Sequence, residues 1–297
     1  MNSRYLRACP VVFQRLVPWI LRIGWVALPF TAGPALASAL NHHPHLRTAS
    51  SVALWALWAV TLVATLVAHP ISLTIVRVVT PATLLALVAS ASDGHASSVA
   101  IGAGGANAAL VAALAFLPAT ALMDVNGPAY PNERRFPLAV PGPLLLGPLP
   151  LAWAVAVSVP IAALLLLADR RWIAGAIATV VCVPTVALLG RAMHTLSRRW
   201  VVFVPAGLVL HDPLSLEDPV LFQRKVIERL GPAPAATDSL DLTHRAPGLA
   251  LELVLTEKVP MVRMHPARRQ GESGASARLL FTPSRPGAVL AEALRRR

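Results

Sequence analysis

Residues 144–168, LLLGPLPLAWAVAVSVPIAALLLLA, run for 25 positions without a charged side chain. A helix needs about 20 apolar residues to cross the hydrocarbon core of a bilayer. This stretch therefore predicts a membrane-spanning helix, and five further stretches before residue 191 repeat the pattern.

The six predicted spans are Leu16–Leu40, Val52–Ala68, Ile71–Ser90, Val99–Leu122, Leu144–Ala168 and Trp172–Gly190. Composition agrees with them, because 56% of the chain is apolar and only 13% is charged. A soluble domain is about a quarter charged. Residues 1–190 are therefore predicted to form a transmembrane helical domain.

The pattern of apolar residues changes to that of strands after Arg199. Residues 200–204, WVVFV, and 208–210, LVL, flank the turn at 205–207 and predict a hairpin. Further strands are predicted at Val220–Val226, Leu240–Thr243, Leu249–Thr256, Val259–Met264 and Arg278–Thr282.

The end of the chain predicts a loop and then a helix. Residues 265–277 are polar and predict a flexible loop. Ser284 is the expected N-cap of a helix over Ala288–Leu294. The predicted fold class is thus an α-helical transmembrane bundle of about six spans, followed at 197–297 by a small α+β domain of antiparallel strands with a C-terminal helix.

The placement of arginine predicts the orientation of the spans. The N-terminal arm, the loop before the fifth span and the exit from the sixth hold eight arginines, against three in the alternate loops. Basic residues collect on the cytoplasmic side, so both termini are expected in the cytoplasm, although the turn Asp169-Arg170-Arg171 argues the other way. Only Lys225 and Lys258 of the 26 basic residues are lysine, which indicates a high-GC bacterial genome and hence the bacterial inner membrane.

Two function classes are not expected. The net charge of +12 is explained by cytoplasmic arginines near anionic headgroups, so we expect the lipid bilayer and not nucleic acid as the partner. Nucleotide-loop, His-Glu-x-x-His and kinase signatures do not occur in the sequence. We therefore expect a protein that is not an enzyme and that uses no cofactor.

The histidines at 42, 43 and 45 form the densest group of metal-ligand types in the chain. Zinc binds three or four such ligands in a tetrahedron. However, Pro44 stiffens this run, and no Cys, Asp or Glu lies close to it in the sequence. The sequence therefore favours solvated loop histidines over a metal site.

Three other polar features have structural interpretations. Arg77 lies near the start of the third span and is expected to extend back to the headgroups. The small residues at 102–109 with Asn107 are expected to let two helices approach closely, and His211-Asp212 before Pro213 indicates a turn rather than part of a catalytic triad. The loop at 124–138 concentrates polar and turn-forming residues, and both a functional role and a simple connection remain open for it.

Two resemblances extend these inferences. The hairpin Arg199–Leu210 and the last strand with its helix, Phe281–Leu290, resemble bacterial pleckstrin-homology-like domains. The whole chain is similar to a family of conserved actinobacterial integral membrane proteins of unknown function, through 130–138, YPNERRFPL, and 198–205, RRWVVFVP. The first resemblance implies docking of proteins or lipids; the second implies no activity.

The leading hypothesis is a non-enzymatic scaffold whose cytoplasmic domain binds a protein partner or anionic lipid headgroups. The expected contact residues are Arg198, Arg199, Arg268, Arg269, Arg295, Arg296 and Arg297, and the alternative for them is an ordinary solvated face. The second hypothesis is a small transporter or channel accessory subunit with a regulatory tail. Against it, the spans contain no paired acids and no evident repeat.

Overall fold

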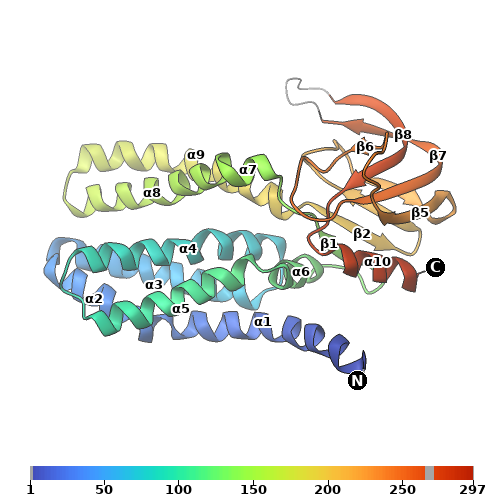
Figure 1. Cartoon of the computed structure of the whole chain (residues 1–297). Helices are drawn as coiled ribbons and strands as arrows, with labels where there is room; N and C mark the ends of the chain where they lie inside the picture. The colour runs from blue at the N-terminus through green and yellow to red at the C-terminus, as the bar shows by residue number, and fades with distance from the viewer. Residues whose placement is uncertain (1–2, 265–270, 297) are drawn as a thin grey trace. The chain divides into compact units, whose positions relative to one another are not determined.

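The computed structural model describes residues 3–264 and 271–296, with the backbone alone for residues 3–15. The chain divides into two compact units. The helical unit comprises Met1–Asp124 and Ala152–Arg191, and the strand unit comprises Val125–Leu151 and Ala192–Arg297. Each unit is therefore built from two separate stretches of chain (Figure 1).

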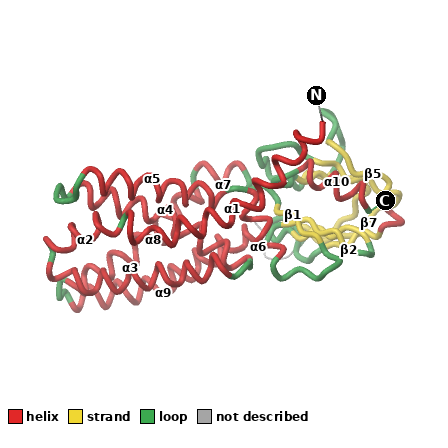
Figure 2. The backbone as a smooth tube through the Cα atoms, turned by 90° about the horizontal axis from the view of Figure 1, so that it is seen from below, coloured by secondary structure: helices red, strands yellow, loops and turns green. Residues whose placement is uncertain are grey.

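The helices of the helical unit lie side by side (Figure 2). They are α1 (Ser3–Thr31), α2 (Gly33–His42), α3 (Pro44–Leu66), α4 (Pro70–Ser92), α5 (Ser98–Phe116), α8 (Pro148–Ala168) and α9 (Trp172–Ser197), with α6 (Pro118–Asn126) at the boundary between the units. Among the described residues, six helical segments are long and apolar enough to cross a membrane, α1 and α2 counting as one. The predicted helical membrane bundle is confirmed.

Prolines account for the breaks in the first and fourth predicted spans. The first predicted span is interrupted at Ala32, between α1 and α2, because Pro34 has no N–H to continue the hydrogen bonds of α1. The fourth predicted span ends at Phe116, and Pro118 begins the separate helix α6. The sixth continues beyond Gly190 to Ser197.

Helices α1 to α5 share one apolar core. Trp25 of α1 is almost completely buried there. Its Nε1 donates to the carbonyl of Trp58 on α3, and Trp58 Nε1 donates back to the carbonyl of Trp25, each over 3.0 Å. This reciprocal pair fixes α1 against α3 and satisfies both indole N–H groups inside the core.

The small residues of α5 allow the close approach that the sequence predicts. A Cβ added at Gly104 would lie 2.9 Å from the Cα of Ala32. One turn along, Asn107 Nδ2 donates to the carbonyl of Gly24 and to Thr31 Oγ1, both at 3.0 Å. The packing interpretation of this stretch therefore holds.

Helices α8 and α9 bury far less of their surface within the protein. In the apolar stretch of α9, 6% of the residues are buried within the protein, and in that of α8 11% are buried. The corresponding share is 33% in both α4 and α5. Trp153 of α8 donates from Nε1 to the carbonyl of Val78 on α4 over 2.9 Å. Large exposed apolar side chains such as Ile173 and Val180 of α9 are typical of helices that face lipid.

The strand unit contains two four-stranded sheets and a C-terminal helix. One sheet has the order β1 (Arg134–Pro137), β2 (Trp200–Val204), β3 (Gly207–His211) and β4 (Val220–Gln223); the other has the order β5 (Ile227–Pro232), β7 (Leu251–Arg263), β8 (Glu272–Phe281) and β6 (Leu240–Asp241), and the helix is α10 (Pro286–Arg295). All pairs are antiparallel except β6 with β8. The predicted hairpin and C-terminal helix are confirmed.

Strand β1 comes from the loop between the fourth and fifth spans, to which the sequence assigned no fold. Arg135 pairs with Val202 and Phe136 with Val201 in register with β2. The side chain of Asn126 also bonds both the N–H and the carbonyl of Arg135, over 2.9 and 2.8 Å. The strand unit therefore includes residues 125–151 in addition to the predicted 197–297.

Other predictions for the strands need correction. The two strands predicted at 249–264 are one strand, β7, with an irregularity between Val254 and Val259. Residues 272–277 belong to β8 and not to a loop, while residues 265–270 lie outside the described part. The N-cap of α10 is Arg285 rather than Ser284, because the helix begins one residue later, at Pro286.

Candidate functional site

The predicted basic contact residues have different surroundings. Arg198 is exposed, and Arg268, Arg269 and Arg297 lie outside the described residues. Arg295 and Arg296 both bind the carboxylate of Glu292, at 2.8 and 2.6 Å. Arg296 also donates to the carbonyl of Asn132 over 3.1 Å.

Arg199 is not available to a partner, because its side chain is only 2% exposed. Its Nε and Nη2 bind the two oxygens of Asp212 over 2.6 and 2.7 Å, and Nη1 donates to the carbonyl of Ala139 over 2.9 Å. The guanidinium thus joins β2, the end of β3 and the chain that follows β1. Arg199 is a structural residue of the strand unit and is removed from the candidate contact set.

Asp212 is held ionised by this network. Burial alone would raise the pKa of its carboxyl, but the bonds and charge of Arg199 and the hydroxyl of Ser215 outweigh burial, so its pKa lies below its ordinary value. Ser215 Oγ donates to Asp212 over 2.7 Å and lies 2.6 Å from His244 Nε2. A catalytic triad requires the carboxylate on the histidine and the histidine on the serine; here the carboxylate holds the serine, so the group is structural.

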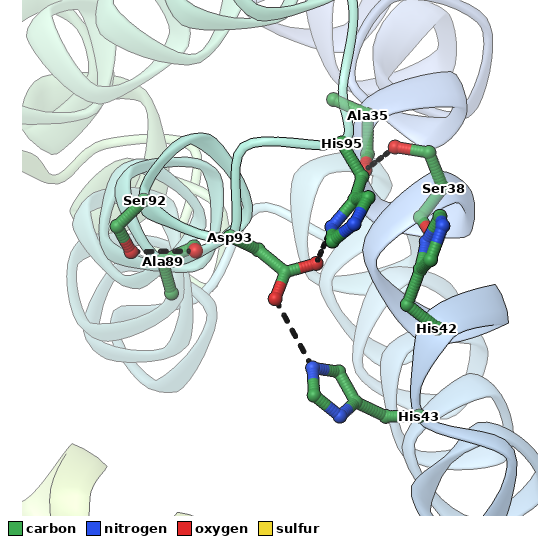
Figure 3. Close-up of polar contacts among 8 residues, drawn as sticks. All are labelled: Ala35, Ser38, His42, His43, Ala89, Ser92, Asp93 and His95. Atoms are coloured by element: carbon green, nitrogen blue, oxygen red, sulfur yellow. Dashed lines mark hydrogen bonds and ion pairs between the residues drawn. The ribbon is translucent and has the colours of Figure 1, made fainter.

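A second polar cluster lies in the helical unit, at the end where α2 meets α3 and α4 meets α5. Asp93, which ends α4, binds His43 Nε2 through Oδ1 over 3.1 Å and His95 Nδ1 through Oδ2 over 3.0 Å (Figure 3). The ring of His42 stacks on that of His95, with centroids 3.6 Å apart and planes at 19°. A nitrogen of His42, one of His95 and an oxygen of Asp93 lie within 4.8 Å of one another.

Sequence patterns do not reveal this cluster, because Asp93 lies 50 residues after His43 of the histidine run. Hydrogen bonds from His43 and His95 lower the pKa of the Asp93 carboxyl below its ordinary value. His45 contacts His43 edge to face but is not among the three residues whose ligand atoms converge. Among the residues that the structure describes, those whose ligand atoms converge as a metal ion requires are therefore His42, Asp93 and His95, with His43 behind the carboxylate.

A third group lies at the opposite end of the helical unit. Arg22 Nε donates to the carbonyl of Thr65 over 2.8 Å, and Arg77 Nε donates to the carbonyl of Ala115 over 3.3 Å. Both guanidinium groups also lie over aromatic rings, those of Trp19 and Phe116. Arg77 therefore contacts the last residues of α5, and its extension to the headgroups stays a prediction.

Asp124 of α6 belongs to the same end and is 2% exposed. Its Oδ1 has no hydrogen-bond partner among the described residues. Burial raises the pKa of its carboxyl to about 7, against the opposing charges of Arg77 and Arg22. Asp124 begins the polar loop at 124–138, for which the sequence leaves a functional role open, but no sequence pattern distinguishes it from an ordinary loop acid.

Comparison of the chain with protein families, with characterised proteins and with solved structures finds no match.

Proposed function

We propose that this protein is a non-enzymatic membrane scaffold that holds the strand unit at the cytoplasmic face of a bacterial inner membrane, where the unit binds a protein partner or anionic headgroups. The observation that carries the proposal is the pairing of β1 with β2. This pairing builds the docking unit from a loop inside the helical region together with the end of the chain.

Connectivity supports a tether of this kind. The chain passes between the units at 124–125, 151–152 and 191–192. Three covalent links restrict the strand unit to the membrane surface far more than one flexible tail would, since each link removes freedom of the unit. A unit held in this way meets partners that are themselves in or on the membrane.

The strand pairing also supports the orientation. Because β1 and β2 share a sheet, the residues before α8 and after α9 belong on one side of the membrane. Helices α8 and α9 therefore either both cross or both do not, and in either case both segments of the strand unit lie on one side. With the arginine excess of the N-terminal arm, the favoured side is the cytoplasm.

Exposed basic residues give the strand unit a surface that suits anionic partners. Arg198 directly follows the last residue of α9 and so emerges beside the headgroups. Other exposed basic residues in the described part of the unit are Arg134, Arg224, Lys225, Arg229, Arg245, Lys258, Arg278 and Arg295. The likeness to pleckstrin-homology-like domains, carried by the β2–β3 hairpin and by β8 with α10, favours the same docking role.

The test is photocrosslinking in living cells. The full chain carries p-benzoylphenylalanine in place of Arg134, Arg198, Arg224 or Arg295, one at a time, with Arg47 as the control position on the other side. We expect a defined protein or phospholipid adduct at one or more of the four positions and none of the same mass at 47. Adducts with water-soluble proteins at random, or with the same species at 47, contradict the scaffold.

The second candidate function is a small transporter or channel accessory subunit, and one observation favours it. Arg22, Arg77 and Asp124 put three ionisable groups inside the helical unit, where charges are costly and often mark a pathway. Vesicles that contain the protein, loaded with a pH-sensitive dye, test it. Proton or anion flux that disappears in Asp124→Asn and Arg77→Gln would favour transport over the scaffold.

A further inference from the structure

We propose that His42, Asp93 and His95 form a binding site for a divalent first-row transition metal ion, with Zn²⁺ as the expected occupant. Nothing in the proposed scaffold function requires this site, so the two proposals stand or fall separately. The site joins the end of α2 to the connection between α4 and α5.

The ligand types suit this class of ion. Imidazole nitrogens bind zinc, copper, nickel and iron, while a carboxylate adds a hard ligand and a negative charge. Two histidines and one carboxylate leave one position open, which is an arrangement that zinc accepts. Calcium and magnesium prefer six or more oxygen ligands, and three ligands of this type do not provide them.

The distances are within reach of coordination. Bonds of 2.0–2.1 Å to a tetrahedral zinc place neighbouring ligand atoms about 3.4 Å apart. The three atoms now lie within 4.8 Å of one another, and rotations of the exposed His42 and His95 side chains can close the remainder. The ion takes the place of the proton that His95 Nδ1 donates to Asp93, and the neutral imidazole then carries its proton on Nε2, so that the Nδ1 lone pair faces the metal.

Neighbouring groups already orient two of the three ligands. His42 Nδ1 lies 2.8 Å from the carbonyl of Ser38. A carbonyl can only accept, so Nδ1 carries the proton and Nε2 keeps its lone pair for a metal. Similarly, His43 donates to Oδ1 of Asp93, which leaves Oδ2 to face the ion. Such outer contacts fix the geometry of metal ligands.

The backbone places Asp93 and His95 on one side of the turn. Gly94 between them has φ of 75°, in the left-handed region that glycine adopts at little cost. A Cβ added there would meet nothing within 4 Å, so its only penalty is the backbone conformation. Gly94→Ala therefore disturbs the placement of two ligands without removing either and without a clash.

The test is a metal titration of the full chain in detergent micelles. The protein carries no polyhistidine tag, has Cys9 and Cys182 replaced by serine, and is stripped of metal before Zn²⁺ is added in a calorimeter. We expect one Zn²⁺ per chain, and Co²⁺ in its place should give the intense visible absorption of a tetrahedral ion. Wild-type protein that binds neither ion above the level of a matched histidine-free protein overturns the proposal.

Variants of single residues distinguish metal binding at this site from nonspecific binding by surface histidines. His42→Ala, Asp93→Asn and His95→Ala should each abolish saturable binding, and His43→Ala or Gly94→Ala should weaken it by about 10–100-fold. His45→Ala, in the same turn but outside the group, is the matched control and should bind as wild type. Equal losses in His45→Ala and His42→Ala contradict the site. Circular dichroism of each variant checks that the helices are intact.

Discussion

Asp124 in the helical unit and Asp212 in the strand unit are both 2% exposed, yet their carboxyls have opposite chemistry. Asp212 binds Arg199 through both oxygens, and its pKa is lowered. Asp124 has one oxygen without a partner among the described residues, and burial raises its pKa to about 7.

The difference teaches that burial alone does not decide the state of an acid inside this protein. A bidentate arginine and a serine hydroxyl compensate for the loss of water around Asp212. The charges of Arg77 and Arg22 act on Asp124 without compensating fully for its burial. Asp212 is therefore a structural anion, whereas Asp124 changes charge near neutral pH and is the group to test for function.

The largest effect is expected when one partner of the Arg199–Asp212 pair is removed. Asp212→Ala leaves a buried guanidinium without its counter-ion, which should lower the stability of the strand unit by about 3–5 kcal/mol. Limited proteolysis of the full chain in denaturant measures this loss. The exposed Arg295 provides the control, and Arg295→Ala should unfold at the same denaturant concentration as the wild-type protein.

The double variant Arg199→Leu with Asp212→Leu sharpens the same point. Removing both charges leaves no uncompensated ion, so the double variant should recover much of the stability that Asp212→Ala loses. A double variant less stable than either single variant would show that the pair contributes more than mutual compensation.

Asp124→Asn should produce the next largest effect. It should raise the stability of the folded protein near neutral pH, whereas Asp212→Ala should lower it. Because the pKa is raised from 3.8 to about 7, the wild-type folded state retains a proton that the unfolded state loses as pH rises above 4. Stability therefore falls between about pH 4 and pH 7, by about 4 kcal/mol. The asparagine variant lacks this loss, and thermal unfolding at pH 4.5 and pH 8 measures it.

The contrast with Asp212 provides the control for that experiment. Its lowered pKa contributes stability that is present above about pH 4 and is lost only as pH falls through the folded-state value. Asp212 should therefore add no slope between pH 5 and pH 8. If wild type and Asp124→Asn have parallel pH profiles in that range, Asp124 is ionised in the folded protein and the comparison fails.

The smallest effect is expected at Asn107, a polar side chain of the helical unit whose amide group is hydrogen-bonded. Asn107→Ala removes the bonds to Gly24 and Thr31, and bonds of this kind between membrane helices contribute about 0.6–2 kcal/mol. Unfolding in mixed micelles measures the change. A loss as large as that of Asp212→Ala would mean that Asn107 has a role beyond helix packing.

Local patterns were sufficient for the elements that depend on local sequence. The length of each apolar stretch predicted the spans, and the run at 200–210 predicted its hairpin. Strand β1 was not predictable in this way, because its four residues, RRFP, have no alternating pattern and pair with a strand more than 60 residues later.

The two polar sites could not be predicted from the sequence for the same physical reason. The approach of Asp93 and His95 to His42 depends on how α2 and α4 end together in space. Asp124 is buried on α6, a separate helix that follows the extended backbone of Leu117 at the end of α5. Sequence order carries neither fact.

The central claim is that the strand unit is built from two segments on one side of the membrane. Single cysteines at Pro128, Gly287 and Gly94, in a background without Cys9 and Cys182, can be labelled in intact cells with a membrane-impermeant maleimide. We predict that position 94 is labelled at once, and that 128 and 287 are labelled only after the membrane is permeabilised. Labelling of 128 and 287 from opposite sides would contradict the pairing of β1 with β2, and with it the scaffold.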